Sequence, residues 1–418
     1  MSVRRSTAVE TALRQRRWFW RDCDGSVTSA KRMALVALAA PMIAACDGPI
    51  DSTAVGSVPG RIAWSLSTLR APSRTGALAA DSEHVYAYVT SLRIDAVRII
   101  DRSVSWSASA DETLDNGFSP RGIARCGDLV IFGSYLKAYA VSPRDGSRAW
   151  SWQPSAGGAL GYGAPVCDGR TVYFGTGAPM LVYAVDVATG NERWHASVAR
   201  SSSTGGFATT PQVGDGVVVA CTRDDVTPAT GMIVGIDAAS GAIKWRYVWD
   251  PLSPATESSC AVSVAVASGI AVGAADDGRI FGIDVQTGSL RWSAPKAPNW
   301  DYPRDERPVW IDAGIAVAGS GSGTVTGYDL ITGVERWSSR DAGGFATVII
   351  GPMVGNRGLF VGVNSSGGAV AFDALTGARR WTLPAGSGLN QQKLFGPGVL
   401  TERLFIAVGS DGLYAVNR

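Results

Sequence analysis

Histidine is almost absent from this chain, because its 418 residues include only His84 and His195. A metal centre built on several histidines is therefore excluded, and a Ser-His-Asp triad would have to use one of these two side chains. The six cysteines include no adjacent pair and no Cys-x-x-Cys pair, which argues against redox and zinc chemistry. We therefore expect no catalytic residue, no metal site and no cofactor.

The chain also lacks an excess of either positive or negative charge, and charged residues make up only 18% of it. Residues 1–45 contain eight Lys and Arg and three Asp and Glu, which leaves 30 basic and 33 acidic residues in the remainder. No basic patch indicates nucleic acid binding. Glycine, in contrast, is abundant, with 51 residues, and aromatic residues make up 9%. This composition favours a turn-rich globular protein over disorder or a coiled coil.

The amino terminus lacks an apolar run long enough to span a bilayer, which takes about 20 residues. Residues 31–46 read KRMALVALAAPMIAAC, in which two basic residues precede thirteen mostly apolar ones. This is the order of a signal peptide, so we interpret residues 1–45 as one. Residues 1–30 fit that order poorly because they carry Glu10, Asp22 and Asp24. They are better explained by a mis-assigned start, with the working signal beginning near Val27.

The segment Ile43-Ala44-Ala45-Cys46 resembles the bacterial lipobox. The resemblance implies cleavage before Cys46 and attachment of acyl chains such as palmitate, which would hold the exported protein on a membrane. Residues 46–60 would then form a lipidated flexible tether. The alternative is an ordinary cleaved signal peptide in which Cys46 is incidental. Asp47 resembles the retention signal of inner-membrane lipoproteins in enterobacteria, so both the inner and the outer membrane remain open.

One phrase, VYAVDVATGNERW at residues 182–194, recurs with small changes at 233–245, 280–292, 325–337 and 369–381. An apolar strand precedes the Asp, and Asp-x-x-Thr/Ser-Gly then predicts a tight turn. The Asp accepts backbone N–H groups of that turn, and Gly takes the positive φ that other residues resist. A second strand follows and carries a Trp four residues after the Gly.

Eight tryptophans repeat in phase with gaps of 42 to 51 residues: Trp64, Trp106, Trp150, Trp194, Trp245, Trp292, Trp337 and Trp381. A period of this length with short strands and turns predicts propeller blades of four strands. We expect these tryptophans to be structural, each docking one blade on its neighbour. The second repeat has Arg98 and Arg102 in the Asp and Gly positions, and the third has Ser142 for Asp, so we expect looser turns there.

The two ends of the repeat region complement each other. Residues 61–66 supply only an outer strand, whereas residues 412–418 supply the strand that normally precedes the turn. A blade shared between them would close the ring and remove a free edge. The sequence therefore predicts an all-β fold, an eight-bladed β-propeller of four-stranded antiparallel blades over residues 61–418, and we expect it to be monomeric.

The motif Asp-x-x-Thr-Gly-x-x-x-Trp resembles the tryptophan-docking motif of PQQ-like β-propeller repeats, over about residues 61–418. Two branches of that family matter, the quinoprotein alcohol dehydrogenases and the BamB scaffolds of outer-membrane β-barrel assembly. The resemblance to the dehydrogenases implies a Ca²⁺ site and a pair of adjacent cysteines. This sequence has no two adjacent cysteines. Length, lipobox and blade number resemble the BamB family. This implies a non-catalytic envelope lipoprotein that binds other proteins, with the β-barrel assembly machinery as a partner. A ligand-binding or sensory propeller is the alternative, and a PQQ-dependent dehydrogenase is the third interpretation.

Cys23 lies in the segment that would be removed, and Cys46 would carry the lipid. The other four cysteines are an even number in an exported protein, which permits two disulfides. Cys126 and Cys167 occupy equivalent places in consecutive repeats, and Cys221 and Cys260 lie in the next two. We expect the pairs 126–167 and 221–260, with buried free thiols as the alternative.

Two segments depart from the repeat and supply the candidate partner-binding residues. Aromatic and arginine side chains dominate binding hot spots when they are exposed. An equal alternative is that these aromatic residues cover the ends of blades. The candidates are Trp249, Trp300, Tyr302, Arg304 and Trp310.

Overall fold

The computed structural model divides the chain into two units, residues 1–52 and 53–418, and all described residues belong to the second. They contain no helix that is long and apolar enough to cross a membrane. The described residues are 58–67, 78–90, 92–112, 122–160, 163–200, 205–224, 230–249, 264–275, 278–294, 309–319, 324–340, 354–356, 358–363, 368–384, 398–409 and 412–418.

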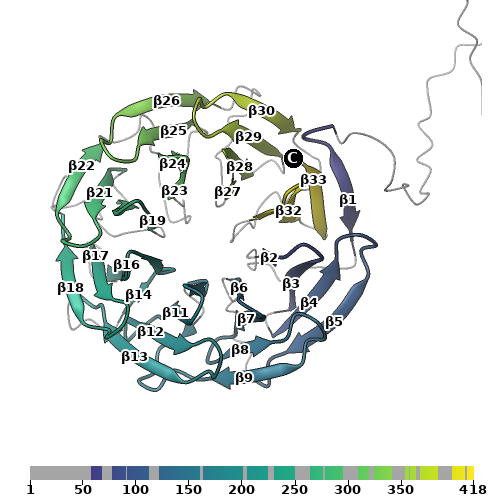
Figure 1. Ribbon diagram of the computed structural model, residues 1–418, viewed down its shortest axis with the longest axis horizontal. Coiled ribbons are helices and arrows are strands. Elements are labelled where there is room, and N and C mark those ends of the chain that lie inside the picture. The colour runs from purple at the N-terminus through teal and green to yellow at the C-terminus, as the bar shows by residue number, and fades with distance from the viewer. Residues whose placement is uncertain are drawn as a thin grey trace, which may run out of the picture. The chain divides into compact units, whose positions relative to one another are not determined.

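The described strands form eight antiparallel sheets, which follow one another around a ring as blades I to VIII (Figure 1). Blade I contains β2 (Ala79–Ala80), β3 (His84–Thr90), β4 (Arg93–Arg98) and β5 (Val104–Ser109). Blade II contains β6 (Ile123–Cys126), β7 (Leu129–Gly133), β8 (Ala138–Val141) and β9 (Arg148–Trp152). Blade III contains β10 (Val166–Cys167), β11 (Thr171–Gly175), β12 (Leu181–Asp186) and β13 (Glu192–Ser197).

The middle of the chain forms three further blades. Blade IV contains β14 (Gly206–Ala208), β15 (Gln212–Gly214), β16 (Val217–Asp224), β17 (Thr230–Asp237) and β18 (Ile243–Tyr247). Blade V contains β19 (Ala265–Ala267), β20 (Ile270–Ala274), β21 (Ile280–Asp284) and β22 (Leu290–Ala294). Blade VI contains β23 (Val309–Asp312), β24 (Ile315–Gly319), β25 (Thr324–Asp329) and β26 (Glu335–Arg340). In blade IV both β14 and β15 pair with β16, so its innermost strand is split in two.

The last two blades complete the ring. Blade VII contains β27 (Val354–Asn356), β28 (Leu359–Val363), β29 (Ala369–Asp373) and β30 (Arg379–Leu383). Blade VIII contains β31 (Val399–Leu400), β32 (Leu404–Val408) and β33 (Leu413–Asn417), and its outer strand is β1 (Ile62–Leu66). β1 pairs with β33 through Trp64 opposite Ala415, so the two ends of the described chain share one blade, as the sequence predicted.

The core lies between neighbouring blades. The second strand of a blade is apolar and wholly buried, as in β20 and β24, because it is covered by a blade on each side. Outer strands alternate instead: in β9 the tryptophans point inward and their neighbours are exposed. Apolar clusters join one blade to the next, as where Ile131 of blade II packs with Phe174 of blade III.

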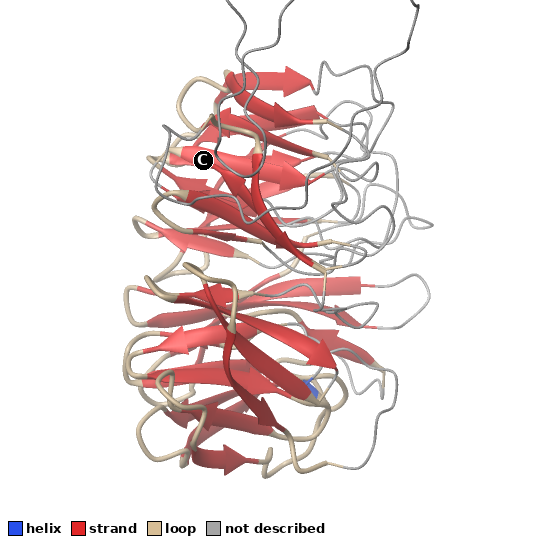
Figure 2. Cartoon of the chain, turned by 90° about the vertical axis from the view of Figure 1, so that its right-hand side faces the viewer, coloured by secondary structure: helices blue, strands red, loops and turns tan. Residues whose placement is uncertain are grey.

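The ring presents two different faces. The Asp-x-x-Thr-Gly turns between the third and outer strands and the links between the first two strands of each blade lie on one face, which we call the turn face. The outer strands run away from it, so each connection to the next blade starts at the opposite face, the loop face (Figure 2). Residues 250–263 and 295–308, which carry Cys260, Trp300, Tyr302 and Arg304, lie outside the described residues.

Candidate functional site

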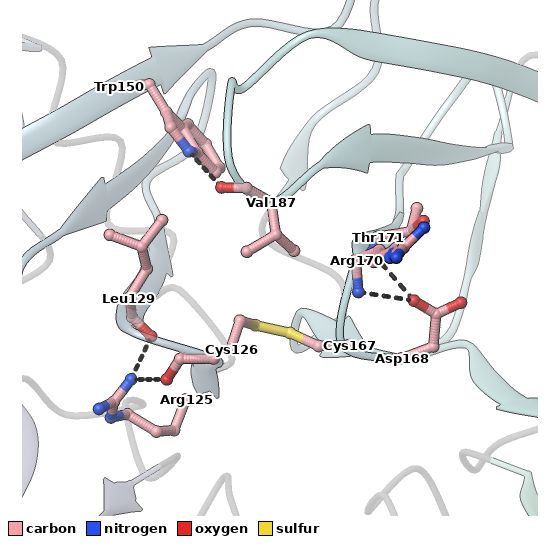
Figure 3. The surroundings of a disulfide bond; sticks show 10 residues. Arg125, Cys126, Leu129, Trp150, Cys167, Asp168, Arg170, Thr171 and Val187 are labelled. Atoms are coloured by element: carbon pink, nitrogen blue, oxygen red, sulfur yellow. Dashed lines mark hydrogen bonds between the residues drawn. A yellow bond between two sulfur atoms is a disulfide. The ribbon is translucent and has the colours of Figure 1, made fainter.

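Tryptophans of the outer strands hold neighbouring blades together. The ring of Trp150 lies on the turn glycine of the next blade, so closely that a Cβ on Gly190 would meet its Cγ at 2.7 Å. Its indole N–H donates to the Val187 carbonyl of that turn at 2.8 Å (Figure 3). The same donation, at 2.8 to 3.0 Å, links Trp106 to Pro143, Trp194 to Ala238, Trp245 to Val285, Trp292 to Leu330 and Trp337 to Ala374.

The tryptophan also explains the small residue opposite it on the third strand. In blade V, Gly282 faces Trp292, and a Cβ there would meet the indole Cε2 at 2.1 Å. Glycine or alanine holds this place in every blade: Ala96, Ala140, Ala184, Gly235, Gly282, Gly327, Ala371 and Ala415. The repeating glycine thus serves positive φ at the turn and close packing at the strand.

Two steps around the ring depart from this pattern. Trp381 packs on Gly60, so closely that a Cβ added to Gly60 would lie 2.9 Å from the Cβ of Trp381. The buried Nε1 of Trp381, however, has no hydrogen-bond partner among the described residues. Trp64 faces blade I, in which Arg102 replaces the turn glycine, and it is only partly buried. Both departures adjoin blade VIII, where the chain is not continuous through the turn.

The carboxylates of the turns are held ionised. Asp284 Oδ1 accepts the N–H groups of Gln286 and Thr287 and the Thr287 hydroxyl, and Oδ2 accepts Arg291 at 2.6 Å. The arginine and the turn N–H group lower the pKa of Asp284 from 3.8 to about 2. Arg193 and Arg336 do the same for Asp186 and Asp329, whose pKa values also fall to about 2. These three carboxylates therefore serve the turns as ionised hydrogen-bond acceptors.

The expectation of looser turns in the second and third repeats is wrong. The N–H of Arg102 donates to the Arg98 carbonyl at 2.9 Å, as the N–H of Gly146 does to Ser142. Arg102 reaches this geometry with a φ of 64°, in the region that favours glycine. Asp101 and Asp145, three residues after the usual Asp position, accept N–H groups in its place. The backbone bond, and not the first Asp, therefore defines the turn.

A disulfide bond joins Cys126 of blade II to Cys167 of blade III, with their Cα atoms 5.8 Å apart (Figure 3). Cys126 ends β6 and Cys167 ends β10, so the bond ties the first strands of two neighbouring blades at the turn face. Cys221 is also disulfide-bonded, and Cys260 and Cys46 lie outside the described residues.

Blade I brings a serine, a histidine and an aspartate close together, but not as a triad. His84 Nε2 lies 2.9 Å from Ser105 Oγ, whereas His84 Nδ1 is 3.8 Å from Asp81 Oδ1, too far for a hydrogen bond. Asp81 is already engaged by the Tyr86 hydroxyl and by backbone N–H groups. Burial alone would raise the pKa of Asp81, but these hydrogen bonds lower it. The other histidine, His195, pairs with Glu192 at 2.8 Å on an outer strand.

Two of the candidate partner-binding aromatics lie within the described residues, and neither is free at the surface. Trp249 is only 5% exposed, because it continues past β18 into the core and its ring lies 5.3 Å from that of Phe281 in the next blade. Of the two interpretations left open for Trp249, this position agrees with burial and not with exposure. Trp310 on β23 is partly buried and packs against the cluster between blades VI and VII. Both aromatics thus pack in apolar clusters between neighbouring blades.

A cavity of about 250 Å³ opens between blades II and III at their loop-face ends. Its walls include Tyr135, Gln153, Pro154, Gly158 and Ala178, so backbone and uncharged groups line it. Nowhere in the described part of the chain do three His, Cys, Asp or Glu side chains lie close enough together to hold a metal ion. The described residues therefore do not supply the carboxylate set that a Ca²⁺–quinone site needs.

Blades joined by docked tryptophans and closed by the two chain ends define a PQQ-like β-propeller. Residues 137–300 and 296–418 match the family model described as "Outer membrane protein assembly factor BamB", and the chain belongs to this family. It is 31% identical over 130 residues to the outer membrane protein assembly factor BamB of Yersinia pestis, and this alignment covers 31% of this chain and 30% of that protein. It is 27% identical over 173 residues to the quinohemoprotein alcohol dehydrogenase of Comamonas testosteroni, which is 39% of this chain and 24% of the enzyme.

These alignments span less than a third of either relative's length. The crystal structure of BamB from Moraxella catarrhalis superposes with a TM-score of 0.56 at 15% identity, over 81% of this chain and 92% of that one. At that identity the superposition establishes the fold alone.

Proposed function

We propose that this chain is a non-catalytic lipoprotein of the cell envelope whose propeller is a platform for other proteins, with a BamB-like role in membrane or envelope protein assembly. The observation that carries the proposal is the family match over residues 137–418. The alignment with the Yersinia protein supports the same role. The turn aspartates support the non-catalytic role further, because arginines and backbone N–H groups hold them in the turns of the fold.

Anchoring is the first part of the proposal. Acylation at Cys46 would place the propeller on the extracytoplasmic side of a bacterial membrane, tethered by residues 46–60. Mass spectrometry of the chain purified from membranes should show an acylated amino terminus at Cys46. An unprocessed amino terminus would contradict the anchor.

Partner binding is the second part. β22 ends at the loop face, and the departing segment that carries Trp300, Tyr302 and Arg304 follows it in the sequence. A photo-crosslinking amino acid at residue 300 should capture a partner in living cells, whereas the same group at Ala239 should not. Ala239 is the matched control because it is exposed on a turn of blade IV. Equal capture at both positions, or unchanged capture from residue 300 after Tyr302→Ala, would contradict this surface.

Ligand binding or sensing is the second candidate function, and the cavity between blades II and III favours it. A PQQ-dependent dehydrogenase is the third, favoured by the alignment with the Comamonas enzyme. A thermal-shift screen of the purified chain with quinones and Ca²⁺ would detect either. A rise in the melting temperature with PQQ and Ca²⁺ together would support the enzyme.

A further inference from the structure

Large apolar side chains are exposed on one side of the ring. Seven of the nine that are exposed among the described residues lie in blades VI, VII, VIII and I. We call this set the apolar arc. It consists of Val58, Ile62, Ile100, Val104, Ile331, Val334 and Leu375, with exposed fractions from 38% to 71%. Of the other two, Leu290 begins the outer strand of adjacent blade V, and Val248 follows β18.

The turn itself does not require these apolar residues. Ile100, Ile331 and Leu375 occupy the same exposed place, two residues after the position of the turn Asp. In blades II to V the same place holds Arg144, Ala188, Ala239 and Gln286. Those turns form the same backbone bond, for example from Gly241 to Asp237 at 2.9 Å. The apolar tips are therefore an addition to the fold, confined to half of the ring.

The four blades of the arc are consecutive. Gly377 of blade VII lies against Trp337 of blade VI, and Gly60 of blade VIII lies against Trp381 of blade VII. Leu78 of blade I shares a core cluster with Ile406 of blade VIII. The tips thus follow half of the rim of the turn face, and this one-sided distribution of exposed apolar side chains makes the arc a candidate interaction site.

Three aspartates in the turns of the arc's blades are paired with arginines. Asp329 pairs with Arg336 at 2.8 Å, Asp373 pairs with Arg380 at 2.5 Å, and Asp101 pairs with Arg98 at 3.0 Å. These pairs neutralise the carboxylates that an anionic lipid surface would repel. The arginines can extend their charged heads beside the apolar tips, as such side chains do at membrane interfaces.

The position of the tether indicates what covers the arc. The described chain begins at Val58, which is itself part of the arc, and Cys46 lies only twelve residues earlier. Twelve residues span at most about 40 Å, so an anchor at Cys46 keeps this side of the ring close to the bilayer. Such tethering raises the effective concentration of the arc at the membrane, so contacts that are weak alone become populated. Separate tips spread over four blades fit a planar occupant better than a concave one.

We propose that the apolar arc lies in the headgroup region of the lipid bilayer that holds Cys46, with Ile100, Ile331 and Leu375 inserted at its surface. This proposal rests on the anchor in the proposed function. It also gives the two faces separate roles: the turn face contacts lipid on one side, and the loop face remains free for partners.

The test uses the acylated full chain, reconstituted in phosphatidylethanolamine–phosphatidylglycerol vesicles whose acyl chains carry bromine. A fluorescent probe is attached at Leu375→Cys, with Ala239→Cys as the control at the same turn position across the ring. Cys126, Cys167 and Cys221 are disulfide-bonded and will not take the label. A second pair, Ile331→Cys and Ala188→Cys, guards against a local effect of one substitution.

We expect bromine to quench the probe at residue 375 at least about twofold more than the probe at residue 239. Equal quenching of the two probes in chains that float with the vesicles would overturn the arc and leave the anchor intact. Chains that do not float would overturn both. If bromine does not quench the probe at residue 375, shielding of that probe only after solubilised membrane proteins are added would assign the arc to a protein partner, and shielding without any addition would assign it to a second copy. Either result would overturn the proposal.

Discussion

Gly60 donates its backbone N–H to the carbonyl of Asn417 at 2.9 Å, and this bond joins residues 357 positions apart in one turn. The N–H of Asn417 donates in return to Arg61 at 2.9 Å. The same two bonds form within the continuous turn of blade III, from Gly190 to Asp186 and from Asp186 to Asn191, both at 2.8 Å. Blade VIII therefore rebuilds the turn of the repeat from two separate segments, which closes the ring without a covalent link.

The turn glycines should differ in importance according to what lies above them. Gly241 and Gly216 both belong to blade IV and have φ of 77° and 75°. A Cβ on Gly241 would meet Trp194 at 2.7 Å, whereas a Cβ on Gly216 would meet nothing within 4 Å. Gly216→Ala should therefore cost about 1–2 kcal/mol from backbone strain alone. Gly241→Ala should cost about 1–3 kcal/mol more because the indole must move. Urea unfolding measures both, and equal losses would contradict the docking role.

The indole hydrogen bonds should be measurable by comparing two tryptophans. Trp292→Phe removes the donor to Leu330 and leaves a buried carbonyl unsatisfied, which should cost about 1–3 kcal/mol beyond the loss of packing. Trp381→Phe removes an Nε1 that has no partner among the described residues, so this extra cost should be absent. The free energies of unfolding of the two variants test the difference. A larger loss for Trp381→Phe would show that the carbonyl contacts contribute little.

Acid should destabilise the ring through its turn carboxylates. The pKa values of Asp186, Asp284 and Asp329 are lowered in the folded state from 3.8 to about 2. Their contribution is present above about pH 4 and is lost as the pH falls toward 2. The melting temperature of the wild type should therefore fall across this window, and the fall should be shallower in the triple Asp→Asn variant. Asp128→Asn is the control, because Asp128 is exposed outside these turns, and it should retain the wild-type slope.

Reducing the bond between Cys126 and Cys167 should weaken the junction of blades II and III. The two residues are 41 positions apart, and closing a loop of that length in the unfolded chain corresponds to about 2–4 kcal/mol. The double variant Cys126→Ala, Cys167→Ala should show this loss in urea unfolding under oxidising conditions. A reductant should then have no further effect that depends on this pair. An unchanged midpoint would mean that the blades hold this junction without the bond.

The sequence predicted the blades because their signal is local and repeated. Eight tryptophans in phase and a glycine four residues before most of them specify strand, turn and strand without any long-range information. The fate of Arg102 was not predictable, because whether an arginine adopts positive φ depends on the bonds around it. The acceptors of the indole N–H groups were also missed, since they are backbone carbonyls of any residue type.

Candidate surface residues were harder to predict than the fold. Trp249 lies in a segment that departs from the repeat, so the sequence left exposure and burial equally open, and in the structure its ring packs against Phe281 of the next blade. That contact depends on the angle between blades IV and V, so it cannot be predicted from the spacing of residues in the sequence. Ile100, Ile331 and Leu375 were not singled out in the sequence, because they form one arc only when the ring brings blades VI, VII, VIII and I into order.

The most direct test of the central claim is a crosslink in living cells. The chain should carry a short epitope at its carboxyl end, be captured under denaturing conditions after crosslinking, and have its attached proteins identified. The account predicts recovery of a β-barrel insertase or its helpers, together with retention of the chain in the membrane fraction. Recovery of unrelated envelope enzymes or receptors, or of a chain with nothing attached, would contradict the assembly role.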